Sequence, residues 1–259
     1  MTNFNLQHTF MDLPAKEIMG LDPNSTRQIV FRITGIVNLF DVPKQDAGLR
    51  NSFKTYLDFV INNKNAFEQL NRDDLRLLKE IKKPSLQRII LSSDNFINTL
   101  SEDELSRYGK CNDLESRVCC AESKIFAKKV PYEVLESLIN DEPDVVSALV
   151  NNENAILRLS RETIEKIAKR DEPIIRRSLI SNKKVPEKLS EDILYGFLVD
   201  PEPLVKIAAL RNPEFTNLID QEYLKKLLKV ETDWRVKECI KMQILSNNVI
   251  QNERRLLRT

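Results

Sequence analysis

Hydrophobic residues recur at fixed distances along most of the chain, and the spacing predicts a row of short helices. From residue 71 onward, a start residue recurs every 29 or 30 positions, with an acid two residues later and apolar residues four and seven residues later. The start residues are Asn71, Ser101, Pro131, Ser160, Ser190 and Asp220. Because residues three apart share one face of a helix, each start predicts a helix of about ten residues with one apolar stripe.

The start residues and the apolar columns each have a physical role in this prediction. A Ser, Asn or Asp oxygen accepts a hydrogen bond from the first turn, and an acid there favours the positive helix end. Pro131 has no capping oxygen but suits the first helical position. We expect the apolar column four residues on to be buried between neighbouring repeats, at Leu105, Leu135, Ile164, Leu194 and Leu224.

A second short helix is predicted after a break in each unit. The break contains a proline or aspartate, and proline both ends one helix and suits the start of the next; these residues are Pro84, Asp113, Pro143, Pro173 and Pro203. The second helices are expected over residues 86–91, 114–121, 145–150, 174–180, 204–210 and 236–240. A polar residue that can end a helix follows the first five: Asp94, Ser123, Asn152, Asn182 and Asn212.

Together these patterns predict an all-α protein, a right-handed α-solenoid of about six two-helix repeats of about 30 residues. The array is expected over residues 70–259, with a short basic C-terminal tail. Residues 1–69 do not follow the period, but 25–40 and 45–62 have apolar helical stripes. We expect them to form an N-terminal helical cap, because the end of an array must cover its exposed face. A distinct interaction module is the alternative.

The array also resembles a known class of repeats. Residues 200–210 have the Asp-Pro, Val-Lys and Ala pattern of HEAT-like repeats, and the following Arg211-Asn212-Pro213 adds the Asn-Pro ending of the leucine-rich repeat variant. This resemblance implies a superhelical scaffold that binds proteins and sometimes nucleic acid, without implying one activity. The basic column typical of such repeats is interrupted here by Val146; its other members are Arg88, Arg117, Arg176, Lys206 and Lys237.

The basic column supports two interpretations. Its cations can pair with the acids that recur in the breaks between helices and so set the stacking of repeats. Alternatively, a row of cations along one face can contact phosphates, each contact adding salt-sensitive affinity. The formal net charge of +1 and the neighbouring acids favour the internal ladder. We therefore hold these five residues as candidate partner or phosphate contacts.

Residues suited to catalysis are scarce. The five glycines are isolated, which excludes a Gly-rich phosphate loop, and the sole histidine is His8. The cysteines match no zinc or disulfide spacing and are expected to be reduced and structural: Cys111, Cys119, Cys120 and Cys239. Architecturally similar HEAT-like DNA glycosylases use an acid among aromatic residues, and Asp233-Trp234-Arg235 is the suggestive cluster here. A single Trp cannot form a cage of several.

The sequence therefore predicts a non-enzymatic helical-repeat scaffold that binds a protein partner, as an adaptor, regulator or immunity-type inhibitor. A nucleic-acid-binding solenoid that uses the basic column is the alternative. No cofactor or metal is expected, because the chain has no nucleotide-binding motif and no metal-ligand spacing. No membrane contact is expected, because no apolar run approaches about 20 residues. No secretory signal is visible at the start of the chain, which makes the cytoplasm the expected compartment.

Overall fold

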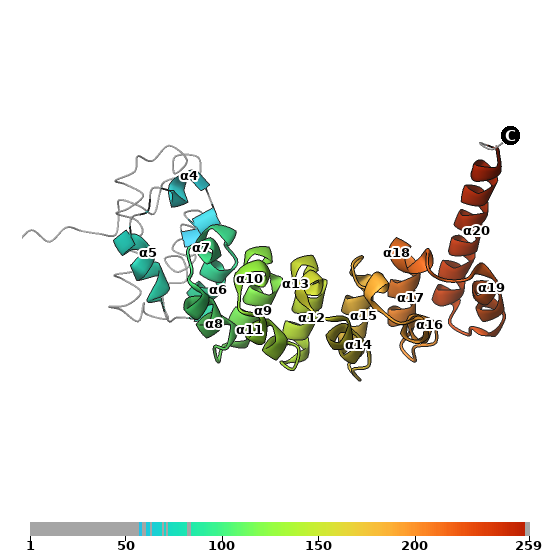
Figure 1. Cartoon of the computed structure of the whole chain (residues 1–259), viewed down its shortest axis with the longest axis horizontal. Coiled ribbons are helices and arrows are strands. Elements are labelled where there is room, and N and C mark those ends of the chain that lie inside the picture. The colour runs from blue at the N-terminus through green and yellow to red at the C-terminus, as the bar shows by residue number, and fades with distance from the viewer. Residues whose placement is uncertain are drawn as a thin grey trace, which may run out of the picture. The chain divides into compact units, whose positions relative to one another are not determined.

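The computed structural model describes residues 57–58, 61–62, 64–68, 70, 72–81 and 84–256. These residues form helices and connecting turns without a strand, which confirms the predicted all-α class for this part of the chain (Figure 1). The chain divides into two compact units, Met1–Phe126 and Ala127–Thr259. His8, Asn71 and the helix predicted over 25–40 lie outside the described residues, as does most of that over 45–62.

The first helices begin where the pattern predicts. They are α5 (Arg72–Lys79), α8 (Glu102–Gly109), α11 (Tyr132–Leu138), α14 (Arg161–Ala168), α16 (Glu191–Leu198) and α19 (Gln221–Val230). Ser101 forms a capping box with Glu104, in which each side chain accepts a hydrogen bond from the other residue's backbone N–H. Ser160 and Asp220 also accept from the first turn, at 3.1 Å each, whereas Pro131 and Ser190 form no side-chain cap.

The second helices are also present. They are α6 (Pro84–Leu91), α9 (Leu114–Glu122), α12 (Pro143–Asn151), α15 (Pro173–Ser181), α17 (Pro203–Arg211) and α20 (Trp234–Leu256). Four of them begin with the predicted proline, at Pro84, Pro143, Pro173 and Pro203. The fixed φ of proline suits the first turn, where its missing N–H leaves no helical bond unmade.

A third short helix, which the sequence analysis missed, follows most second helices. These elements are α7 (Asp94–Asn98), α10 (Lys124–Lys129), α13 (Glu153–Arg158), the 3₁₀ helix η1 (Pro186–Lys188) and α18 (Pro213–Thr216); α4 (Lys64–Phe67) precedes α5. Asn152 and Asn212 were predicted to end helices, and each also caps the next one. We call a first helix, the second helix and the short element after it a helix group.

Within the unit Met1–Phe126, α6 packs against α9 and α7, and α8 packs against α9. The core comes from all three kinds of helix: Leu105 of α8, Phe96 of α7 and Leu91 of α6 are fully buried. The apolar column therefore faces this core as predicted, although Leu75 of α5 is only half-buried.

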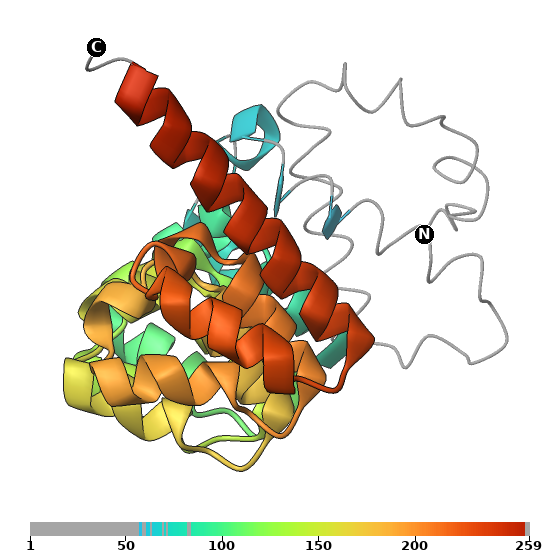
Figure 2. The same ribbon diagram turned by 90° about the vertical axis from the view of Figure 1, so that its right-hand side faces the viewer.

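Within the unit Ala127–Thr259, the second helices pack in chain order, α12 against α15, α15 against α17, and α17 against α20. Each first helix packs on the second helix of its own group, as α19 does beside α20 in Figure 2. Leu135, Ile164 and Leu224 are fully buried, and Leu194 is 6% exposed. The predicted burial of this column is thus confirmed.

The last second helix differs from those before it. α20 has 23 residues, whereas α12, α15 and α17 have nine each. The asparagine that ends those three helices is replaced by Gln243, and α20 continues to Leu256. Among the described residues, no helix is long and apolar enough to cross a membrane.

Candidate functional site

Buried asparagines join successive helix groups. Asn182 donates from Nδ2 to the Val150 carbonyl at 2.9 Å, and Asn212 donates to the Ile180 carbonyl at 2.7 Å. The Oδ1 atoms of both asparagines accept a backbone N–H two residues further on. Since carbonyls at helix ends lack helical partners, these bonds satisfy groups that would otherwise be buried and unpaired. Gln243 keeps the corresponding bond to the Leu210 carbonyl, at 2.8 Å.

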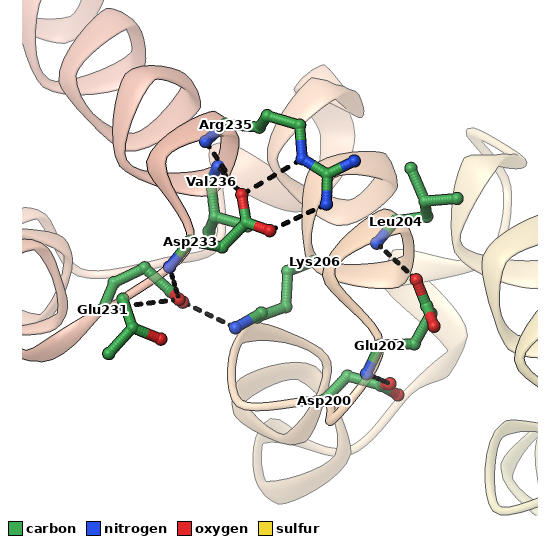
Figure 3. A network of polar contacts seen from close by, with 9 residues as sticks. Asp200, Glu202, Leu204, Lys206, Glu231, Asp233, Arg235 and Val236 are labelled. Atoms are coloured by element: carbon green, nitrogen blue, oxygen red, sulfur yellow. Dashed lines mark hydrogen bonds and ion pairs between the residues drawn. The ribbon is translucent and has the colours of Figure 1, made fainter.

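The basic column forms buried ion pairs between groups at two positions. Arg176 donates from Nε and Nη2 to the two carboxylate oxygens of Asp200, at 2.7 and 2.9 Å. Lys206 donates to Glu231 at 2.6 Å (Figure 3). These side chains are 12% exposed or less. Each acid also accepts a backbone N–H, from Glu202 or from Thr232 and Asp233. The cations therefore hold the loop before the next second helix.

The surroundings of these ion pairs stabilise the charged forms of Glu231 and Arg176. Burial alone raises the pKa of Glu231, but the hydrogen bonds from Lys206 and the backbone more than offset it, so the pKa is lowered. The bond to Asp200 raises the pKa of Arg176. Arg176 also donates from Nη1 to the Arg170 and Asp171 carbonyls. A phosphate would have to displace these contacts to reach the guanidinium.

The first group corrects the predicted membership of the column. Arg117 donates to the Cys111 carbonyl six residues earlier, as Arg176 does to Arg170. In α6 the corresponding bond comes from Gln87, which donates to the Ile81 carbonyl at 2.8 Å. Arg88 lies one residue further on and forms an ion pair with Glu115. Arg176 is the third residue after Pro173, and Gln87 is the third residue after Pro84. Gln87, rather than Arg88, therefore occupies the equivalent position of the column.

The two remaining positions of the column also differ from one another. Val146 is fully buried, and in that part of the unit Arg170 pairs with Glu172 and donates to the Ile139 carbonyl at 2.9 Å. Lys237 is half-buried, and the described residues provide no ion pair for it. Because the acids that pair with Arg176 and Lys206 lie in the following group, Lys237 stands where the ladder ends.

A groove of about 330 Å³ lies between α15 and α17, and none of the five basic-column residues lines it. Its apolar residues are Leu204, Ile207, Ala208 and Pro213, its cations are Arg177, Lys183 and Arg211, and Ser181 and Asn212 complete it. The three cations are exposed. Within the described part of the chain, no carboxylate lines the groove and none pairs with these cations. None of these three cations was predicted from the sequence as a contact residue, although all three lie outside the apolar stripes.

The Asp233-Trp234-Arg235 cluster forms a helix cap. Asp233 accepts hydrogen bonds from the Arg235 side chain and from the backbone N–H groups of Arg235 and Val236 (Figure 3). The Arg235 side chain contributes most to lowering the pKa of Asp233 to about 2. Trp234 is 72% exposed. This arrangement provides neither an aromatic enclosure nor an acid held ready to accept a proton near neutral pH.

The four cysteines form no disulfide with one another. Burial raises the pKa of Cys111, Cys119 and Cys120, which favours the protonated thiol over the nucleophilic thiolate. In the described residues, no cluster of three or more His, Cys, Asp or Glu side chains could hold a metal ion. A comparison with protein-family models gives no match to this chain, and a comparison with curated proteins gives none either.

Proposed function

We propose that this chain is a non-enzymatic scaffold that binds a protein partner, built as a right-handed α-solenoid of about six HEAT-like or leucine-rich-repeat-variant repeats. Residues 1–69 would cap the first repeat. The spacing of the first helices and the packing of α12, α15, α17 and α20 in chain order support this architecture. The free cysteines are consistent with a reducing compartment, and we propose the cytoplasm.

One contrast carries the proposal. Arg176 and Lys206 form buried ion pairs with carboxylates. The groove, by contrast, has three exposed cations beside its apolar residues: Arg177, Lys183 and Arg211. Ile174 and Leu204 add large apolar side chains, 42% and 41% exposed, at matching positions of α15 and α17. Apolar side chains rimmed by polar ones are typical of surfaces that bind proteins.

The nucleic-acid alternative loses support from the same contrast. In the basic column, which this alternative requires to contact phosphates, three cations already pair with carboxylates: Arg88, Arg176 and Lys206. Releasing Arg176 or Lys206 would leave Asp200 or Glu231 buried without its cation, which costs several kcal/mol. We therefore do not propose phosphate binding by this column.

The test is recovery of a partner from the native cell with the tagged full-length chain, followed by nuclease treatment and mass spectrometry. We expect a protein partner that nuclease does not release. The double variant Ile174→Asp/Leu204→Asp should abolish recovery. The control, Leu157→Asp/Leu218→Asp, changes two leucines that are somewhat more exposed, at 55% and 51%, and lie outside α15 and α17; it should retain the partner. Recovery of nucleic acid alone would contradict the proposal.

A further inference from the structure

We infer that the groove between α15 and α17 binds an acidic peptide segment that carries an aliphatic side chain. This inference rests on the proposed function and names the chemistry of the partner. The groove joins two features: apolar lining residues, and three exposed cations that pair with no carboxylate in the part of the chain that the structure describes. Both come from residues that the helices hold in fixed positions.

The rim provides the charge complementarity. Arg177 is the fifth residue of α15, Arg211 is the last residue of α17, and Lys183 follows the end of α15 by two residues. The carboxylates nearest in the ladder are already bound, Asp200 by Arg176 and Glu231 by Lys206. Arginine presents a fork of donors that matches a carboxylate, and lysine adds a mobile point charge. Acidic side chains of a partner are therefore the ligands that this rim fits.

The floor distinguishes a peptide from a nucleic acid. Leu204, Ile207, Ala208 and Pro213 provide aliphatic surface, and Leu204 is 41% exposed. No aromatic side chain lines the groove in the described residues, so a base would find no ring on which to stack. An aliphatic side chain of a peptide can instead cover Leu204 while its flanking acids reach Arg177 and Arg211.

The probe is a short fluorescein-labelled peptide in which leucines alternate with pairs of aspartate and glutamate. Its binding to the full chain is measured by fluorescence anisotropy, beside two control peptides and a labelled single-stranded RNA of equal charge. One control peptide replaces the acids by their amides, and the other replaces leucine by alanine. We expect the acidic leucine peptide to bind, each control to bind more weakly, and added salt to lower the affinity.

Two charge-matched variants locate the site. Arg177→Glu/Arg211→Glu should weaken binding of the acidic peptide by about tenfold or more, since it replaces attraction with repulsion at two of the three cations that line the groove. Lys169→Glu/Lys226→Glu makes the same change of charge at exposed lysines outside the groove and should leave the affinity unchanged. Circular dichroism of both variants checks that the helices remain.

The outcomes separate this inference from the proposed function. Failure of the acidic peptide to bind, or equal loss in both variants, overturns the groove assignment. The groove assignment also falls if the RNA binds more tightly than the acidic peptide and Arg177→Glu/Arg211→Glu abolishes that binding. Such a result would favour a phosphate ligand. If the cellular protein partner is still recovered by Arg177→Glu/Arg211→Glu, the scaffold proposal stands while the groove assignment falls.

Discussion

Asp200 accepts two hydrogen bonds from the Arg176 guanidinium, at 2.7 and 2.9 Å, and a third from the Glu202 backbone N–H at 2.9 Å. Its carboxylate thus holds the turn before α17 and joins that turn to α15. The side chain is 7% exposed, so water cannot replace a lost partner. The same arrangement of one cation and one acid recurs at Lys206 and Glu231.

Removal of one partner from this pair should be costly. We expect Arg176→Ala to lower the free energy of unfolding by about 3 kcal/mol, because Asp200 would remain charged and buried without its cation. The double variant Arg176→Met/Asp200→Asn should lower the free energy of unfolding by less. Asparagine is neutral, and its side-chain oxygen can still accept a hydrogen bond from the Glu202 backbone N–H. Urea unfolding of the single and double variants measures the coupling between the two residues.

An exposed ion pair provides the comparison. Lys225 and Glu222 lie 2.7 Å apart but are 47% and 67% exposed. Lys225→Ala should therefore change the free energy of unfolding by less than about 0.5 kcal/mol. A loss at Arg176 no larger than the loss at Lys225 would contradict a structural role for the ladder.

The asparagine bonds lead to a second prediction. Asn212→Ala should cost about 2 kcal/mol, because it removes the cap of α18 and leaves the buried Ile180 carbonyl without its donor. Asn151→Ala, at an exposed position at the end of α12, should change stability by less than about 0.5 kcal/mol. Thermal melts of the two variants provide the measurement, and equal melting temperatures would argue against the bond between groups.

The apolar column leads to a third prediction. Ile164 is fully buried, so Ile164→Ala should lower the free energy of unfolding by about 2–5 kcal/mol through lost burial and a residual cavity. Ile164→Val removes one methylene and should cost about 1 kcal/mol. Leu218→Ala, at a half-exposed leucine, is the control. Denaturant unfolding in which Ile164→Ala matches Leu218→Ala would show that this column does not form the core.

Stability should also depend on pH through Glu231. Its pKa is lowered from 4.5 in the folded chain, so its contribution is complete above about pH 4.5 and is lost as pH falls through the folded value. Glu231→Gln cannot titrate, and we expect its melting temperature to fall less steeply than that of the wild type below that pH. Melts over a series of acidic buffers measure the two slopes; parallel slopes would contradict the pairing with Lys206.

The sequence predicted those parts of the fold that repeat over at least two helical turns. The first helices and their buried column could be located because α8, α14 and α16 each combine a capping position with an apolar stripe. The third elements have three to six residues, too few for a stripe to emerge. Asn152 and Asn212 were therefore recognised only as helix ends, although each also begins a helix.

The candidate site was less accessible to sequence reasoning. Arg176 and Lys206 could be identified from the sequence because they recur once per repeat. Such recurrence is also what a series of ion pairs between successive groups requires. Arg177 and Arg211 occupy non-equivalent positions in their helices, so no column contains both. Only the packing of α15 on α17 brings them to one groove.

The bonds between helix groups also constrain how the length of such a chain can change. Asn182 reaches the carbonyl of Val150, and Asn212 reaches that of Ile180, each 32 residues earlier. A tandem gene duplication that copies one whole group supplies every new amide with a carbonyl in the copy before it. An insertion or deletion that moves an asparagine away from the helix end before it leaves an amide and a carbonyl buried without partners, which folding penalises. Chains of this design can therefore grow or shrink by complete groups but not by single helices.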